Sequence, residues 1–129
     1  MINTGVYNYI DVLDKAADAS WIRNEVINNN ISNNDTPGFK RQDVQFDDIL
    51  AREIRSVQYR DLDDAVAGVN LNRVTGRVYT DSVSFSYRID GNNVDMDTEN
   101  VELASNQIKY NALIESVSQE FARLKSVIK

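Results

Sequence analysis

The side chains that could carry out chemistry in this sequence are mostly carboxylates. Asp90, Asn92, Asp95, Asp97 and Glu99 follow one another closely, and such oxygen-rich clusters suit calcium. The spacing does not match a helix–loop–helix calcium site. Counted from Asp90, the sixth residue is aspartate where glycine is needed, and the twelfth is valine where glutamate is needed. We therefore favour helix capping and solvation over a metal site.

Nucleophilic and metal chemistry is further restricted because the chain has neither histidine nor cysteine. This composition removes thiol nucleophiles, disulfides, imidazole or thiolate metal sites and Ser–His–Asp triads. Asp47 and Asp48 form a carboxylate pair, but consecutive acids are typical of a helix start, and no sequence feature supplies a pocket for them. We expect no enzyme, no cofactor and no metal.

Length and charge set further bounds. The chain has 129 residues, about one domain, and its 14 basic and 20 acidic residues give a net charge of −6. A negative surface repels phosphate backbones, which argues against nucleic acid as a partner. No apolar run approaches the ~18 residues of a membrane span, and the first residues lack the pattern of a cleaved secretory signal.

Two long helices must organise the chain. Spacing predicts the first from about residue 6 to residue 32, with apolar positions that alternate every four and three residues, as in a coiled-coil seam. A second apolar stripe beside this seam indicates more than one packing neighbour. The seam positions assigned to an assembly interface are Ile10, Leu13, Ala17, Asn24, Ile27 and Ile31.

The second long helix is predicted from about residue 95 to residue 128, with Asp95 as its N-terminal cap. Its seam repeats the same alternation. The positions assigned to the interface are Leu103, Gln107, Tyr110, Ile114, Val117, Phe121, Leu124 and Ile128. Polar seam residues such as Asn24 and Gln107 either set the register of packing or face water, and the sequence leaves both readings open.

The middle of the chain changes character. Pro37–Gly38 suits a type II turn. A short helix is predicted over residues 46–59, a loop over 60–68, a hairpin at Thr75–Gly76 flanked by 69–71 and 77–80, and a strand over 83–89. The expected fold is mainly α. Terminal segments 1–39 and 95–129 form a coiled-coil-like core, and the acidic segment 40–94 forms a small α/β or β-hairpin element.

The turn after the first helix carries a recognisable motif. Residues 28–40 read NNNISNNDTPGFK, which resembles the N-terminal motif of flagellar axial proteins, the rod and hook class, whose pattern is roughly NNIANxxTPGYK. Serine at 32 and phenylalanine at 39 are mild departures. The matching motif positions are Asn30, Asn33, Asn34, Thr36, Pro37, Gly38 and Phe39. By residue type alone, residues 28–40 are the end of a helix followed by a turn. The resemblance to axial proteins favours a second interpretation, in which this segment is a functional joint between the core helix and the outer parts of the subunit.

A second motif, DGNNVDMD over residues 90–97, leads into NQIKY at 106–110 and is similar to a proximal-rod protein, in preference to its sister FlgC. The resemblance implies a rod subunit of the flagellar basal body, in the periplasmic space, exported by the flagellar type III system without a cleaved signal. Implied partners are further copies of the chain, FlgC, FlgF, FlgG, FliE and the export gate in the membrane ring. The alternatives are the sister protein, a cytoplasmic coiled-coil adaptor or, least favoured, a carboxylate-dependent hydrolase.

Overall fold

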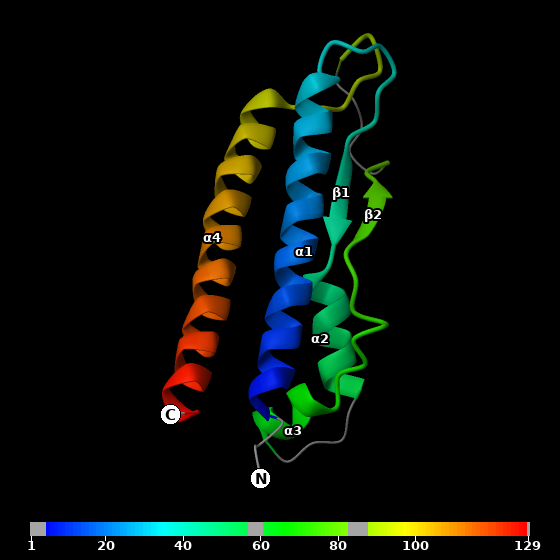
Figure 1. The fold of residues 1–129 in the computed structure, drawn as a ribbon. Coiled ribbons are helices and arrows are strands. Elements are labelled where there is room, and N and C mark those ends of the chain that lie inside the picture. Colours follow the sequence, from blue (N-terminus) through cyan, green and yellow to red (C-terminus); the bar gives the residue numbers. More distant parts are fainter. Residues whose placement is uncertain (1–4, 57–60, 83–87, 129) are drawn as a thin grey trace.

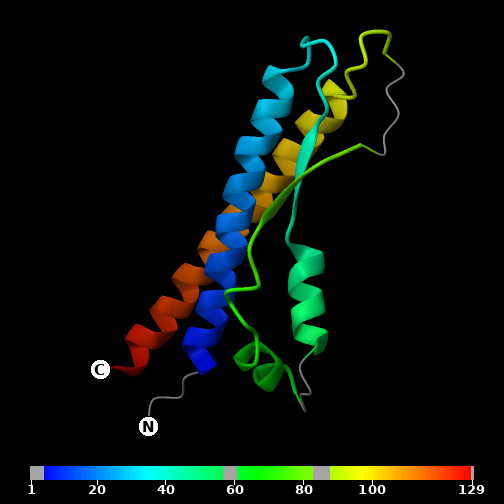
Figure 2. The same cartoon turned by 90° about the vertical axis from the view of Figure 1, so that its right-hand side faces the viewer.

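Two long helices, α1 (Gly5–Ser32) and α4 (Met96–Val127), run antiparallel along the whole molecule (Figure 1). The computed structural model describes residues 5–56, 61–82 and 88–128. In Figure 1 the remaining elements lie beside α1 on the side opposite α4, and Figure 2 views the molecule from that side. The predicted fold class, a helical core with a small α/β middle element, is confirmed.

Helix α1 is covered on two sides, as its two apolar stripes predict. Ile27 is fully buried, and the small side chains of Ala16, Ala17 and Ala19 are also buried. Small residues let neighbouring backbones approach closely, so α1 can contact α4 on one side and the middle elements on the other. A cluster of Ala16, Ala19, Phe46 and Val74 forms the core on that second side.

Helix α4 is covered on one side only. Asp95 caps it as predicted, because its carboxylate accepts hydrogen bonds from the backbone N–H groups of Asp97 and Thr98. Glu99 and Asn106 are its only buried residues, and both are polar. No helix in the described ranges is sufficiently long and apolar to cross a bilayer.

The small sheet pairs β1 (Gln42–Gln45) with β2 (Arg77–Thr80) in antiparallel register, with Val44 opposite Val78. The expected pairing of residues 69–71 with 77–80 is therefore wrong. Val74 is fully buried, and a Cβ on Gly76 would lie 3.2 Å from side chains of Ala19 and Val44. This segment therefore packs on α1 and β1 instead of pairing with β2. Most of the strand predicted over 83–89 lies outside the described residues.

Two short helices complete the middle. Helix α2 (Asp47–Ser56) begins with the two aspartates that predicted it. The loop expected over 60–68 is wrong, because Leu62–Ala67 forms helix α3. Asp61 caps α3 by accepting a 2.9 Å hydrogen bond from the N–H of Asp64, while Ala65 and Val66 are buried. Burial of these two residues stabilises a helix too short to form alone.

Candidate assembly interface and the joint beside it

The turn after α1 has the predicted type II geometry. The N–H of Phe39 donates to the carbonyl of Thr36 at 3.2 Å, and Gly38 has a φ of 72°. A positive φ at this position of the turn favours glycine, which has no Cβ to clash with the backbone. The turn reverses the chain at the end of the molecule opposite the termini (Figure 1).

The two sequence motifs meet at this end. The N–H of Gly38 donates to the carbonyl of Asp90 at 2.8 Å, and the N–H of Asn93 donates to the carbonyl of Phe39 at 3.3 Å. Lys40 also reaches the carbonyl of Gly91. We name residues 33–40 together with 88–94 the joint. It ties the end of α1 to the segment that leads into α4.

Asn92 is the central side chain of the joint and is fully buried. Its Nδ2 donates to the carbonyl oxygens of Asn33, Asn34 and Thr36 at 2.8–2.9 Å. Its Oδ1 accepts from the N–H of Val94 at 2.8 Å. One amide side chain thus adds hydrogen bonds to three carbonyl groups of the turn after α1 and holds the segment before α4 against that turn. The sequence places Asn92 in the second motif, over residues 90–97, but does not predict its hydrogen bonds to the turn after α1.

Replacing Asn92 by aspartate should destabilise the fold by about 3 kcal/mol, because a carboxylate cannot donate and would face three carbonyl oxygens. The free energy of unfolding in urea measures this effect. Asn72→Asp is the matched control, since Asn72 is exposed, and it should change stability by less than about 0.5 kcal/mol. Equal stability of the two variants would refute the role given to Asn92.

Asn30, another fully buried motif residue, holds β1 against α1. Its Nδ2 donates to the carbonyl of Gln42 at 2.7 Å, and its Oδ1 accepts from the N–H of Gln42 at 2.9 Å. These two bonds reproduce the pairing that a neighbouring strand would provide. The same Nδ2 donates to Oε2 of Glu99 on α4 at 3.1 Å, so Asn30 joins its own helix α1 to two other elements, β1 and α4.

A network of charged side chains continues from this point. Arg41 Nε donates to Glu99 Oε1 at 2.6 Å, and Arg41 Nη1 donates to Asp81 Oδ2 at 3.0 Å. Arg23 bridges Asp43, at 2.8 Å, and Glu102, at 2.6 Å. The network therefore links α1, β1, α4 and the residue after β2, and it fixes their relative positions without a large apolar core.

The pKa values of Arg23 and Arg41 are both raised above the ordinary value of arginine. The hydrogen bond to Asp43 is the largest cause that raises the pKa of Arg23, against the lowering effect of burial. For Arg41, burial lowers the pKa most, but hydrogen bonds to Glu99 and Asp81 and the nearby carboxylates together raise it above its ordinary value. Both guanidinium groups stay charged, as a structural ion-pair network requires.

Asp43 makes part of the stability dependent on pH. Burial raises its pKa, but the hydrogen bonds from Arg23 and from the N–H of Val44 and the charges of Arg23 and Arg41 outweigh burial and lower it overall. In the unfolded chain the pKa of an aspartate is about 3.9. A carboxylate whose pKa is lower in the folded chain stabilises the fold at pH values above about 3.9. This contribution to stability is lost as the pH falls through the lower pKa of the folded chain.

We therefore expect Asp43→Asn to be less stable than the wild type at pH 7, with a difference that shrinks as the pH falls below about 4. Urea unfolding at a series of pH values measures it. Asp48→Asn, at an exposed position, should retain the pH dependence of the wild type. A constant difference between Asp43→Asn and wild type across the acid range would contradict the assignment.

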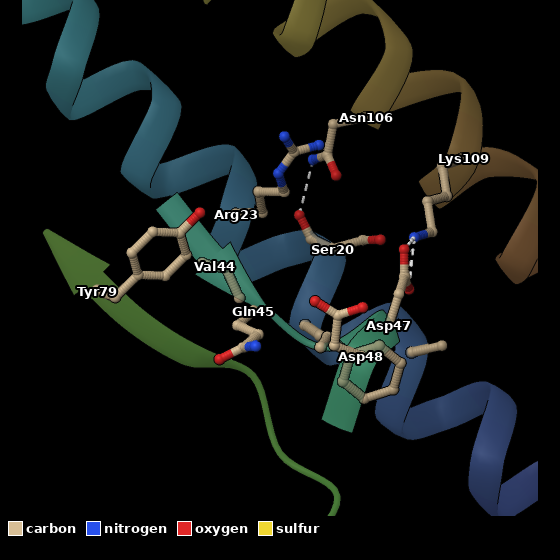
Figure 3. Close-up of a pocket in the computed structure, with 12 residues that line it drawn as sticks. Ser20, Arg23, Val44, Gln45, Asp47, Asp48, Tyr79, Asn106 and Lys109 are labelled. Carbon is tan, nitrogen blue, oxygen red and sulfur yellow. Dashed lines mark hydrogen bonds and ion pairs between the residues drawn. The ribbon is translucent and has the colours of Figure 1, made fainter. Parts of the chain in front are cut away.

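A polar pocket of about 440 Å³ lies beside this network, between α1, α4, β1 and the start of α2 (Figure 3). Lys109 reaches across it to Asp47, with an Nζ to Oδ2 distance of 2.9 Å, and Asn106 donates to the carbonyl of Ser20 (Figure 3). Arg23 is already paired with two carboxylates. The charged groups at this pocket thus hold elements together, and Asp47 is an ion-pair partner as well as a helix start.

The candidate calcium ligands have other partners. Asp90 accepts from Arg88 and from the N–H of Asn92, Asp95 caps α4, and Glu99 pairs with Arg41. Within residues 5–56, 61–82 and 88–128, no group of three or more acidic side chains is placed to hold a metal ion. The capping prediction for Asp95 is confirmed.

The predicted seam residues fall into three groups. Ile10, Ala17 and Ile27 are buried within the chain. Leu13, Asn24, Ile31, Leu103, Tyr110, Val117 and Leu124 are partly buried. Gln107, Ile114, Phe121 and Ile128 are exposed. The seam positions of α4 therefore alternate along the helix. Every second position is partly buried on the side that faces α1, and the positions between them are exposed to solvent.

The outward residues form an apolar stripe. Ile114, Phe121 and Ile128 are 43%, 51% and 66% exposed and lie seven residues apart along α4. Sequence reasoning identified these three but missed Val101, Ile108 and Val127, which are also exposed apolar residues of α4. These three residues do not occupy seam positions, so the alternation of four and three residues did not identify them.

A pair of long helices with an uncovered apolar stripe, held at one end to a small outer element, is typical of a structural subunit. No protein-family model matches the chain. It is 38% identical over 124 residues to the flagellar basal body rod protein FlgB of Bacillus subtilis, covering 92% of both chains.

Two further FlgB proteins are similar. That of Borrelia hermsii is 34% identical, covering 93% of this chain and 95% of its own, and that of Escherichia coli is 30% identical, covering 82% of each. The chain belongs to the FlgB family of flagellar basal body rod proteins. The resemblance to a flagellar rod protein is thereby confirmed. The relatives are structural proteins, which supports a structural role over catalysis.

Proposed function

We propose that this structural subunit of the flagellar basal body rod assembles in the proximal rod through its terminal helices. The observation that carries the proposal is the exposed stripe of Ile114, Phe121 and Ile128 on α4. Complete burial of such a side chain from water contributes on the order of 1.5–3 kcal/mol, and because these three are about half exposed in the single chain, about half of that remains to be gained by each. Neighbouring subunits that covered the stripe would therefore add several such contributions for each chain.

The chain also suits export in an unfolded state through the flagellar type III system. It has no cysteine, so no disulfide has to be broken before translocation. Helix α4 packs on one side only and buries only two polar residues. A helix covered so little is held weakly in the single chain and gains order when neighbours cover it.

The neighbours we propose are further copies of the chain, the rod subunits FlgC, FlgF and FlgG, FliE and the export gate, with the rod lying in the periplasmic space. The joint and the assembly stripe would have separate roles: the joint holds α1, the outer element and α4 in place, and the stripe contacts other subunits. The seam residues buried inside the chain contribute to assembly by positioning α4.

Cryo-electron microscopy of purified basal bodies tests the proposal. We expect the chain in the innermost rod layer, with the stripe of α4 against neighbouring subunits. Absence of the chain from basal bodies would refute it. Hydrogen exchange on the free chain provides a second measurement: the C-terminal half of α4 should exchange rapidly, and full protection of both α1 and α4 would count against assembly-dependent ordering.

Sedimentation of the purified chain separates this proposal from a cytoplasmic adaptor. An adaptor would form a stable small oligomer at micromolar concentration, through the same stripe. A rod subunit should instead sediment as a monomer or as open, polydisperse assemblies, because contacts that do not close produce filaments.

A further inference from the structure

One side of α1 is left uncovered by the rest of the chain. The helix packs against α4 and against the middle elements, and residues three and four apart form a further side that is exposed throughout. We name this side the acidic row, and its members are Tyr7, Asp11, Asp14, Asp18, Trp21 and Glu25. The row carries four carboxylates, no basic residue and two aromatic rings, Tyr7 and Trp21, which are 46% and 53% exposed.

Interactions within the chain do not account for these acids. Every ion pair among the described residues uses other carboxylates, so all four in the row lack a cationic partner there. Asp14 has Asp11 three residues before it and Asp18 four residues after it, and like charges at these spacings repel on a helix. Aspartate is also a poor residue for a helix interior. The row therefore weakens α1 in the single chain, and a positively charged partner would remove this repulsion.

The middle elements carry a matching positive surface. Helix α2 and the segment 69–80 lie side by side (Figure 2), and the N–H of Asn70 donates to Glu53 Oε1 at 3.3 Å. Over residues 49–56 and 69–80 the chain has four arginines and a single acid, Glu53. All four arginines are exposed, and none forms an ion pair in the described part of the chain. We name them the arginine patch: Arg52, Arg55, Arg73 and Arg77.

The arginine patch matches the row better than the other basic side chains do. Within the described residues, five basic side chains are exposed without an ion pair or a hydrogen bond, namely the four of the patch and Lys125. Lys125 lies apart from the patch, on α4. A guanidinium group binds a carboxylate through two N–H groups and stacks on aromatic rings, whereas a lysine ammonium is a point charge. The row offers both carboxylates and aromatic rings, so its chemistry favours arginine.

We propose that the acidic row of one copy binds the arginine patch of a second copy of this chain. From Asp11 to Glu25 the row is about 21 Å long, and the ten residues of α2 extend the patch over about 15 Å, so the two surfaces have similar lengths. A single exposed ion pair contributes little, but this contact combines several pairs with two aromatic rings and recurs at each subunit.

The contact has to form between molecules. The patch belongs to elements that pack on another side of α1, and no arginine of the patch pairs with the row within the chain. A contact between two different surfaces is heterologous and adds subunits in an open series. The inference rests on the proposed assembly of the chain in the rod and names one contact within it.

Charge reversal on the row tests the contact. Asp14→Arg with Asp18→Arg should lower the amount of the chain in purified basal bodies about tenfold, because positive side chains would then face the patch. The same substitutions remove repulsion within α1, so the urea midpoint of the single chain should stay equal or rise. A folding defect would lower both quantities. Asp35→Arg with Asp64→Arg, an equal charge change at exposed positions outside the row, should match the wild type in basal bodies.

Reversal of the patch provides the matching experiment. Arg52→Glu with Arg55→Glu should lower the amount in basal bodies to a similar extent. The chain with all four substitutions should return to near the wild-type amount, because each contact then has both charges exchanged. If another rod subunit occupied the row, its charge would be unchanged and the amount would stay low. That result, or wild-type amounts of either double variant, would overturn the proposal.

Co-expression of the two double variants shows whether the partner is a second copy. Each variant alone should be scarce in basal bodies. Together they should enter in equal amounts, because the reversed row of one fits the reversed patch of the other in an alternating series. Continued scarcity of both would refute a contact between copies. If the wild-type chain itself is absent from basal bodies, the proposed function fails instead.

Discussion

Phe121→Asp is expected to abolish rod assembly and swimming while leaving the isolated chain folded. Phe121 is 51% exposed in the single chain, so the substitution removes only part of its packing and leaves the buried residues of α1 and the middle elements unchanged. In the assembled rod the same position would bury a carboxylate among apolar side chains, which costs several kcal/mol unless it is paired. Because every copy carries the change, the loss recurs at every contact. Ile114→Asp should behave in the same way.

Motility in soft agar and immunoblots of purified basal bodies measure the effect, and circular dichroism and urea unfolding confirm the fold. Val78→Asp is a suitable control, because Val78 is 43% exposed but lies on β2, away from the stripe. That strain should swim. A motile Phe121→Asp strain with normal rods would contradict the role given to α4.

Glu99→Ala should destabilise the single chain by about 3–5 kcal/mol, the usual cost of removing one partner of a buried ion pair. Glu99 is 1% exposed and accepts from Arg41 at 2.6 Å and from Asn30 at 3.1 Å. Its loss would leave the half-buried Arg41 guanidinium with fewer partners and the Asn30 amide without its contact to α4. Helix propensity does not explain the loss, because alanine favours a helix at least as much as glutamate.

The free energy of unfolding from urea titrations measures this prediction. Glu115→Ala is the matched control, an exposed glutamate on the same helix, and should change stability by less than about 0.5 kcal/mol. Glu99→Gln keeps the shape and some hydrogen bonds and should fall between the two. An alanine variant as stable as the control would show that the network on α1, β1 and α4 does not hold the elements together.

Local signals in the chain were sufficient for the long helices and their ends. Asp95 caps α4 because a side-chain oxygen can reach N–H groups two and three residues later, a contact that depends only on near neighbours. The Pro37–Gly38 turn is equally local, since proline and glycine each set their own backbone angles. Helix α3 carried a similar signal in Asp61, which the sequence interpretation underestimated.

Contacts between distant residues were not predictable in the same way. β2 pairs with β1 rather than with residues 69–71, because burial of Val74 and the close approach of Gly76 to Ala19 direct the chain along α1. The bonds of Asn92 to the turn after α1 join residues more than fifty positions apart. Such pairings depend on the path of the whole chain, and residue types and spacing do not encode them locally.

The sequence by itself determined the two long helices, their apolar alternation, the capped start of α4 and the motif turn, because these follow from backbone geometry and neighbours within a few residues. Only the tertiary structure decided which half of the α4 seam faces the α1 side and which half, with Phe121, remains exposed. Periodicity identifies apolar positions, but the arrangement of packed elements decides which of them are covered within one chain and which are left for another.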